Sequence, residues 1–251
     1  MFPTISIGPL AIRTPGLIII LGLWVGIYLA EKDAKTFKFN ANKIINLITI
    51  TGLAGIIGAR VFYALKYLDY FIDAPLSFIS INPGLLDVYG GLATGLISGL
   101  IYMQRQNMSV LPTLDMLTGF FALNCISLSF SNIASGDAYG IISDLPISIE
   151  LWGAKRFPVQ FIYFLFACII FWIILSQRHN IFIQSEKEGN LFFIFLALCS
   201  GSLVFLEPFR ESNTLIFNSI RLTQIAAWSV FVISMFSLLK INIKENKTIG
   251  E

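Results

Sequence analysis

The chain contains seven apolar stretches, each of a length that suits a membrane-spanning helix, and they occupy most of its 251 residues. A helix needs about 20 predominantly apolar residues to cross the hydrocarbon core of a bilayer. Because lipid offers the backbone no hydrogen-bond partners, such stretches fold as helices. The predicted spans are Pro15–Ala30, Ile44–Leu65, Leu85–Met103, Val110–Phe130, Phe157–Ser176, Leu191–Leu206 and Ser219–Leu239.

The composition supports the same interpretation. Only 13% of the residues are charged and 56% are hydrophobic, whereas a soluble domain carries roughly 25% charged residues. These values exclude soluble globular and disordered proteins. We therefore predict an all-α integral membrane protein, a bundle of about seven helices in which residues 1–251 form a single transmembrane domain.

Several classes of partner find no support in the sequence. The net charge is only +2, and basic residues do not interleave with aromatic ones as they do on nucleic-acid-binding surfaces. No nucleotide motif and no Cys-x-x-Cys pair occurs. We expect no nucleic acid, no metal and no cofactor.

The distribution of Lys and Arg predicts the orientation. Cytoplasmic loops carry an excess of these residues. Basic residues concentrate in the first connection and in the C-terminal tail, which are on the same side of a seven-helix bundle. The prediction is an extracytoplasmic N-terminus and a cytoplasmic C-terminus, based mainly on Lys32, Lys35, Lys38, Lys43, Lys240, Lys244 and Lys247.

An arginine ends the tripeptide Gly58-Ala59-Arg60 toward the end of the second span. A lipid-facing arginine is costly there, although snorkelling relieves much of the cost. Two interpretations stay open. Arg60 is either a snorkelling anchor or a cation that faces the bundle interior and holds a lipid phosphate. Gly55 and Gly58 would allow another helix to approach closely.

A run of small polar residues, Ser131–Gly140, follows the fourth span without a break. Asn132 would lie near the membrane boundary and Asp137 just beyond it. Gly136 and Gly140 permit turns or close backbone approach. The run is either a polar site or an ordinary turn, because the same residue types favour turns.

A charged segment, Glu207–Asn213, closes the sixth span. Pro208 is expected to kink or end the helix. Glu207 and Arg210 are three positions apart and can pair. The guanidinium fork of Arg210 also matches phosphate oxygens. The alternative is a solvated helix end.

Glycines at positions 91, 95 and 99 repeat every fourth residue at the start of the third span. Such a stripe is typical of closely packed helices. Asp115 in the fourth span and Gln224 in the seventh are isolated polar groups, and we expect them to cap or bridge helices.

The order of these motifs resembles the phosphatidylglycerol–prolipoprotein diacylglyceryl transferase family. The resemblance runs nearly from end to end, and its individual motifs are short. They are the N-terminal segment Pro3–Arg13, Gly58-Ala59-Arg60, Gly90-Gly91-Leu92, Asn132 with Gly136–Gly140, Pro158 with Gln160, Glu207 with Arg210, and Gln224.

The resemblance implies a reaction in the bacterial cytoplasmic membrane. The family moves a diacylglyceryl group from phosphatidylglycerol to the thiol of a lipobox cysteine, and glycerol phosphate leaves. The implied partners are phosphatidylglycerol, or a related anionic phospholipid, and a prolipoprotein signal peptide. The implied catalytic residues are Asn132, Asp137 and Glu207, and the implied lipid-phosphate contacts are Arg60, Gly140 and Arg210.

The sequence departs from the family pattern at several positions, so the resemblance implies a divergent member. No histidine follows the paired glycines, where the chain reads Ala93-Thr94-Gly95. Pro15 stands in place of a tyrosine, and Ser129 and Leu203 stand in place of two arginines. Phe157 replaces a histidine, and Ile162-Tyr163 replaces a Tyr-Glu pair.

Three functions are possible, in order of preference. The first is a transferase of this family that acts at the outer leaflet, for which Arg60, Asn132, Asp137 and Arg210 should converge on one cavity. The alternative is a catalytically inactive or repurposed member that binds lipid or lipoprotein. A small transporter is less favoured, because paired repeats with broken helices are not visible.

Overall fold

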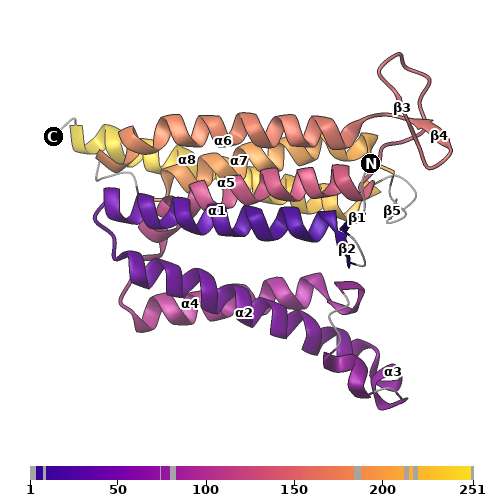
Figure 1. The fold of residues 1–251 in the computed structure, drawn as a ribbon. Helices are drawn as coiled ribbons and strands as arrows, with labels where there is room; N and C mark the ends of the chain where they lie inside the picture. The colour runs from indigo at the N-terminus through magenta and orange to yellow at the C-terminus, as the bar shows by residue number, and fades with distance from the viewer. Residues whose placement is uncertain are drawn as a thin grey trace. The chain divides into compact units, whose positions relative to one another are not determined.

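The computed structural model describes residues 4–7, 10–73, 75–79, 83–183, 188–211, 215–216 and 220–249. The described chain is almost entirely helical (Figure 1). It divides into two compact units, one formed by Met1–Leu29 with Leu114–Glu251 and the other by Ala30–Thr113. The prediction of one continuous domain stays a prediction.

The first unit is a bundle of helices that run side by side (Figure 1). Its core lies between three of them and consists of Ala122, Ile170, Ile174, Leu191 and Phe195. The helices are α1 (Thr14–Thr36, up to Leu29), α5 (Val110–Ser135, from Leu114), α6 (Val159–Ile183), α7 (Asn190–Leu206) and α8 (Leu222–Ile249).

The second unit is built on two helices, α2 (Ala41–Lys66) and α4 (Val88–Arg105), which pack against each other. A Cβ atom at Gly91 would lie 3.0 Å from the carbonyl oxygen of Gly55, so the glycine stripe brings the two backbones together as predicted. Asp87 caps α4 by accepting the Gly90 N–H at 2.7 Å. The connection contains α3 (Leu68–Asp73) and the short 3₁₀ helices η1 (Pro75–Ile79) and η2 (Pro83–Leu85).

The predicted number of membrane spans was too high. Each predicted stretch contains a long helix, but within the described residues six helices, and not seven, are long and apolar enough to cross a membrane. The one that falls short is α4. It has only 18 residues, and the last two are the polar Gln104 and Arg105. It begins at Val88, three residues later than the sequence pattern suggested, because Asp87 caps its start. The predicted orientation of the termini stays a prediction.

The described residues include three two-stranded antiparallel hairpins that were not predicted, and all three lie in the first unit. The hairpin β3–β4 orders the long connection after α5, and its turn is Trp152-Gly153, with φ of 54° and 73°. Two residues in the left-handed region are typical of a tight hairpin turn. The strands are β1 (Thr4–Ile7), β2 (Leu10–Arg13), β3 (Ile149–Leu151), β4 (Ala154–Arg156), β5 (Leu215–Ile216) and β6 (Ile220–Arg221).

Candidate functional site

A cavity of about 340 Å³ lies in the first unit, between α5, α6 and α7. Its lining is mixed, with hydroxyl, amide and charged side chains as well as aliphatic and thiol ones. The polar residues are Ser129, Asn132, Asp137, Tyr163, Ser202 and Arg210, and the remaining ones are Cys125, Leu128, Ala138, Ala167, Ile170, Cys199 and Leu203.

The end of α5 places Asn132 and Asp137 at this cavity. The chain leaves the helix at Gly136, whose φ is 79° and whose N–H donates to the Asn132 carbonyl at 2.9 Å. Gln160 is buried, with 1% of its surface exposed, and its Nε2 donates to the Asp137 carbonyl at 2.6 Å. The glutamine singled out in the sequence therefore fixes the backbone of Asp137.

The end of α7 brings Arg210 to the same cavity. Pro208 ends the helix as predicted, since α7 stops at Leu206 and a 3₁₀ turn, η3 (Glu207–Phe209), follows. Arg210 then forms an antiparallel bridge with Gly140. Two hydrogen bonds hold the bridge, Ile141 N–H to the Phe209 carbonyl at 3.0 Å and Glu211 N–H to the Tyr139 carbonyl at 2.9 Å.

Gly140 is required by this close approach. A Cβ atom at the position would lie 2.2 Å from the carbonyl oxygen of Phe157 and 3.1 Å from that of Phe209. No other residue type fits without moving the backbone. The implied contact of Gly140 with a lipid phosphate stays a prediction.

Glu207 is the buried centre of a polar network, with 2% of its surface exposed. Its carboxylate accepts hydrogen bonds from the Thr223 hydroxyl at 2.6 Å and from the Tyr163 hydroxyl at 3.3 Å. The Arg210 Nη1 lies 3.9 Å away, so the predicted Glu207–Arg210 pair is confirmed. The Arg221 guanidinium donates to the Glu207 carbonyl. A buried charge needs such partners.

Arg210 retains an unused donor. Its Nε is buried and has no hydrogen-bond partner among the described residues. Buried donors in folded proteins are nearly always paired. A ligand oxygen beside Arg210 would satisfy this donor, and a planar guanidinium suits an oxyanion with two or more oxygens.

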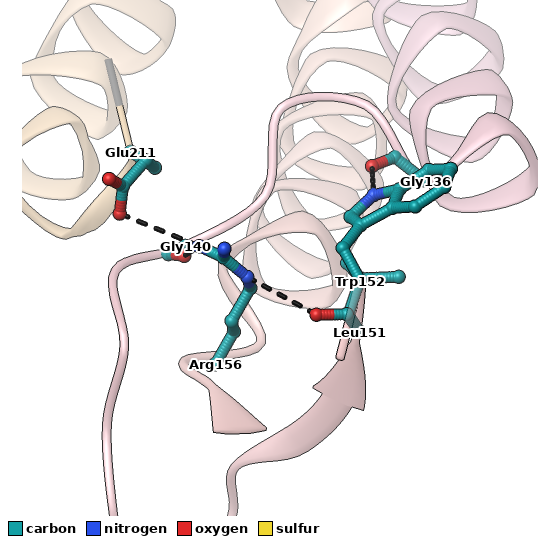
Figure 2. Close-up of polar contacts among 6 residues, drawn as sticks. All are labelled: Gly136, Gly140, Leu151, Trp152, Arg156 and Glu211. Carbon is teal, nitrogen blue, oxygen red and sulfur yellow. Dashed lines mark hydrogen bonds and ion pairs between the residues drawn. The ribbon is translucent and has the colours of Figure 1, made fainter. Parts of the chain in front are cut away.

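Arg156 does not line the cavity, but it connects β3 with the segments that carry Gly140 and Glu211 (Figure 2). It donates from Nε to the Leu151 carbonyl at 3.2 Å and from Nη1 to the Gly140 carbonyl at 3.3 Å. Its Nη1 also lies 3.5 Å from the Glu211 carboxylate. Its guanidinium carbon stands 4.5 Å from the centre of the Tyr139 ring.

Sequence reasoning missed Tyr163, Arg156 and Trp152. A signal for Tyr163 was available, because it follows Gln160 by three positions and so faces the same side of α6. Arg156 and Trp152 act through contacts that depend on a hairpin the sequence did not reveal.

Arg60 lies in the other unit and is buried, with 8% exposed. Its guanidinium donates to three backbone carbonyls, those of Phe78 at 2.8 Å, Leu85 at 2.9 Å and Ser77 at 3.1 Å. It therefore holds the connection between α2 and α4. Three of the four residues expected to converge line one cavity, and the convergence of Arg60 with them stays a prediction.

Two of the positions that depart from the resemblance, Ser129 and Leu203, line the cavity and bring no cation to it. A third, Pro15, accepts a hydrogen bond through its carbonyl from the Ser131 hydroxyl at 3.2 Å. Among the residues that line the cavity, the cation is therefore Arg210.

Comparison with known proteins agrees with these features. The family model described as prolipoprotein diacylglyceryl transferase matches residues 3–240. Three relatives are each named phosphatidylglycerol–prolipoprotein diacylglyceryl transferase. The protein of Staphylococcus aureus strain MSSA476 is 24% identical over 96% of this chain and 89% of its own. That of Clostridium botulinum strain Langeland is 26% identical over 96% and 97%. That of Streptococcus pyogenes serotype M5 is 27% identical over 93% and 92%.

The relatives are bacterial, and six helices of the described chain suit a membrane. The chain is therefore a multi-pass protein of the bacterial cytoplasmic membrane. It belongs to the prolipoprotein diacylglyceryl transferase family.

Proposed function

We propose that this protein transfers a diacylglyceryl group from phosphatidylglycerol, or a related anionic phospholipid, to the cysteine thiol of a prolipoprotein signal peptide. The observation that supports it best is the cavity of a family member, which is lined by Asn132, Asp137 and Arg210 together with several apolar side chains. A phospholipid offers matching groups, since it has a charged headgroup and apolar chains.

In this proposal the lipid phosphate lies against Arg210. The guanidinium has a buried Nε without a partner among the described residues, and its Nη1 lies 3.9 Å from the Glu207 carboxylate. A pre-positioned cation of this kind stabilises the negative charge that builds up on a departing phosphate. The glyceryl and acyl parts of the lipid lie against Leu128, Ile170 and Leu203.

The reaction needs no nucleophile from the enzyme. The acceptor thiol loses its proton to a carboxylate, and the exposed Asp137 at the cavity is our candidate. The sulfur then forms a bond to the glyceryl carbon, while the bond from that carbon to the phosphate oxygen breaks. Glycerol phosphate leaves with the electron pair and takes up the proton. Asn132 orients the reacting groups, so that positioning contributes to the rate.

A second function has its own support. Ser129 and Leu203 leave the cavity without the two arginines that the resemblance implies. A member with fewer cations retains a lipid-shaped cavity and stabilises a leaving phosphate less well. This favours, as the alternative, a member that binds lipid or lipoprotein without catalysis.

The two functions differ in one assay. Purified protein, phosphatidylglycerol and a synthetic lipobox peptide should yield a peptide whose mass has increased by one thioether-linked diacylglyceryl group. The matched controls are the same peptide with serine in place of cysteine, the donor phosphatidylcholine, and the variant Asp137→Asn. No product, together with intact phosphatidylglycerol binding, would reject the transferase and leave the binding protein.

A further inference from the structure

The hairpin β3–β4 contacts both ends of the five-residue segment Gly136–Gly140 (Figure 2). Trp152, at the turn, donates from Nε1 to the Gly136 carbonyl at 3.1 Å. Arg156, at the end of β4, donates from Nη1 to the Gly140 carbonyl at 3.3 Å. The segment between these two contacts includes Asp137, which lines the cavity.

Arg156 also contacts the chain that carries Arg210. Its Nη1 lies 3.5 Å from the Glu211 carboxylate, and its guanidinium stacks on the Tyr139 ring at 4.5 Å. Tyr139 and Glu211 are joined by a backbone hydrogen bond of the bridge between the two segments. The guanidinium thus contacts both sides of the bridge, and its side chain is only 14% exposed.

Trp152 is an unusual residue for its position. Its φ of 54° lies in the left-handed region, which bulky side chains rarely adopt. The residue stays 67% exposed, so burial offsets little of the backbone cost. Residues held in such a conformation cluster at functional sites. The contact that the ring gains there is the hydrogen bond from its N–H to Gly136.

We propose that Trp152 and Arg156 are positioning residues for the cavity. They hold the segment Gly136–Gly140 at its two ends, so that Asp137 and Arg210 face the same cavity. We call these two contacts the strap. This inference rests on the proposed function for its activity measurement, since Asp137 acts there as the proton acceptor. Neither strap residue is among those that line the cavity.

The first test replaces Trp152 with asparagine. Asn-Gly is the most favoured sequence for this turn, so Trp152→Asn keeps the hairpin and removes the indole donor. The thermal unfolding temperature should stay the same or rise. The turnover number should fall about fivefold, as expected for one lost hydrogen bond, and KM for phosphatidylglycerol should change less. Trp152→Phe should show the same loss of turnover, and Trp228→Phe on α8 is the matched control.

The second test replaces Arg156 with lysine, which keeps the charge but loses the planar group that reaches both carbonyls. Turnover should fall about tenfold or more, and Lys155→Arg on the neighbouring strand position should change it less than twofold. Full turnover in Trp152→Asn, Trp152→Phe and Arg156→Lys would overturn the proposal.

Amide hydrogen exchange tests the strap without activity. The N–H groups of Ile141 and Glu211 hold the bridge to Arg210. In Trp152→Asn and Arg156→Lys they should exchange about two- to tenfold faster than in the wild type, while peptides of α6 stay unchanged. Unchanged exchange at the bridge would overturn the strap. If the wild type makes no product, the transferase proposal fails, and this exchange measurement alone decides whether the strap exists.

Discussion

Arg210 and Arg60 both lie at the ends of apolar stretches, but their hydrogen-bond partners and their exposure differ. Arg60 donates to three backbone carbonyls at 2.8 to 3.1 Å and is 8% exposed. Arg210 has a carboxylate at 3.9 Å, a side chain that is 39% exposed, and a buried Nε with no partner among the described residues. The first guanidinium is engaged by its own chain, and the second has a donor available for a ligand.

The backbone around each arginine accounts for the difference. Arg60 faces a connection that contains short 3₁₀ turns, and carbonyls of these turns accept hydrogen bonds from its guanidinium. Arg210 lies instead on an extended segment whose own backbone is paired to Gly140. With its neighbours' carbonyls already engaged, its side chain points into a cavity. The two arginines therefore differ in the backbone carbonyls within their reach. Arg60 binds the carbonyls of its own chain, whereas Arg210 keeps a donor for a ligand.

Removing Arg210 should have the largest effect on transfer. Arg210→Ala is expected to lower the transfer rate about 100-fold, the typical loss when one preorganised donor to a developing anion is deleted. The unfolding temperature should change little, because the long contact to Glu207 is the ion pair that is lost. The rate is measured with phosphatidylglycerol and a lipobox peptide, with Lys155→Ala as control. A rate within threefold of wild type would remove Arg210 from the site.

Glu207 supports Arg210 and should have the next effect. Glu207→Gln keeps the shape but removes the charge that faces the guanidinium. It also weakens the hydrogen bonds from Tyr163 and Thr223. We expect transfer to fall about tenfold and the free energy of unfolding to fall by about 2 kcal/mol, the usual cost for a hydrogen bond to a charged group. Thr223→Val separates the two quantities, because it should lower stability with little change in rate. Equal rates in wild type and Glu207→Gln would contradict a role for the network.

A second cation in the cavity tests the importance of available charge. Leu203→Arg places a guanidinium on α7 at a position that lines the cavity and that the resemblance gives to arginine. A new charge-assisted hydrogen bond to phosphate should raise the rate about tenfold. Leu203→Gln is the uncharged control of similar length. A stable Leu203→Arg protein with an unchanged rate would show that the single arginine suffices.

Much of this comparison was accessible from the sequence, because it depends on local patterns. Hydropathy located the helices, the glycine stripe predicted the close packing of α2 on α4, and the spacing of Glu207 and Arg210 predicted their pair. Asp115 was expected to cap or bridge helices, and its carboxylate accepts the N–H groups of Gly189 at 2.5 Å and Phe192 at 2.8 Å at the start of α7. Each of these follows from the period of a helix or from the cost of a buried charge.

The features that the sequence did not reveal depend on contacts between distant segments. Three short hairpins lack the alternating patterns by which strands are recognised. The acceptors of Arg60 lie 17 to 25 positions along the chain, and Tyr163 meets Glu207 across 44 positions. Whether an arginine is engaged by its own backbone depends on such contacts, so the sequence alone left both interpretations of Arg60 open.

The smallest effect on transfer is expected for Arg60, and this variant tests the other side of the comparison. Arg60→Ala leaves three carbonyls without their donor, which should lower the free energy of unfolding by roughly 3 kcal/mol, given about 1 kcal/mol or more for each bond. Transfer per folded molecule should fall less than threefold. Stability is followed by thermal unfolding in detergent and by the rate of proteolysis in the connection between α2 and α4. Arg60→Lys should recover part of the stability, because an ammonium can reach one of the carbonyls. The opposite pattern, with unfolding unchanged and transfer lost as in Arg210→Ala, would place Arg60 at the lipid phosphate and abolish the distinction between the two arginines.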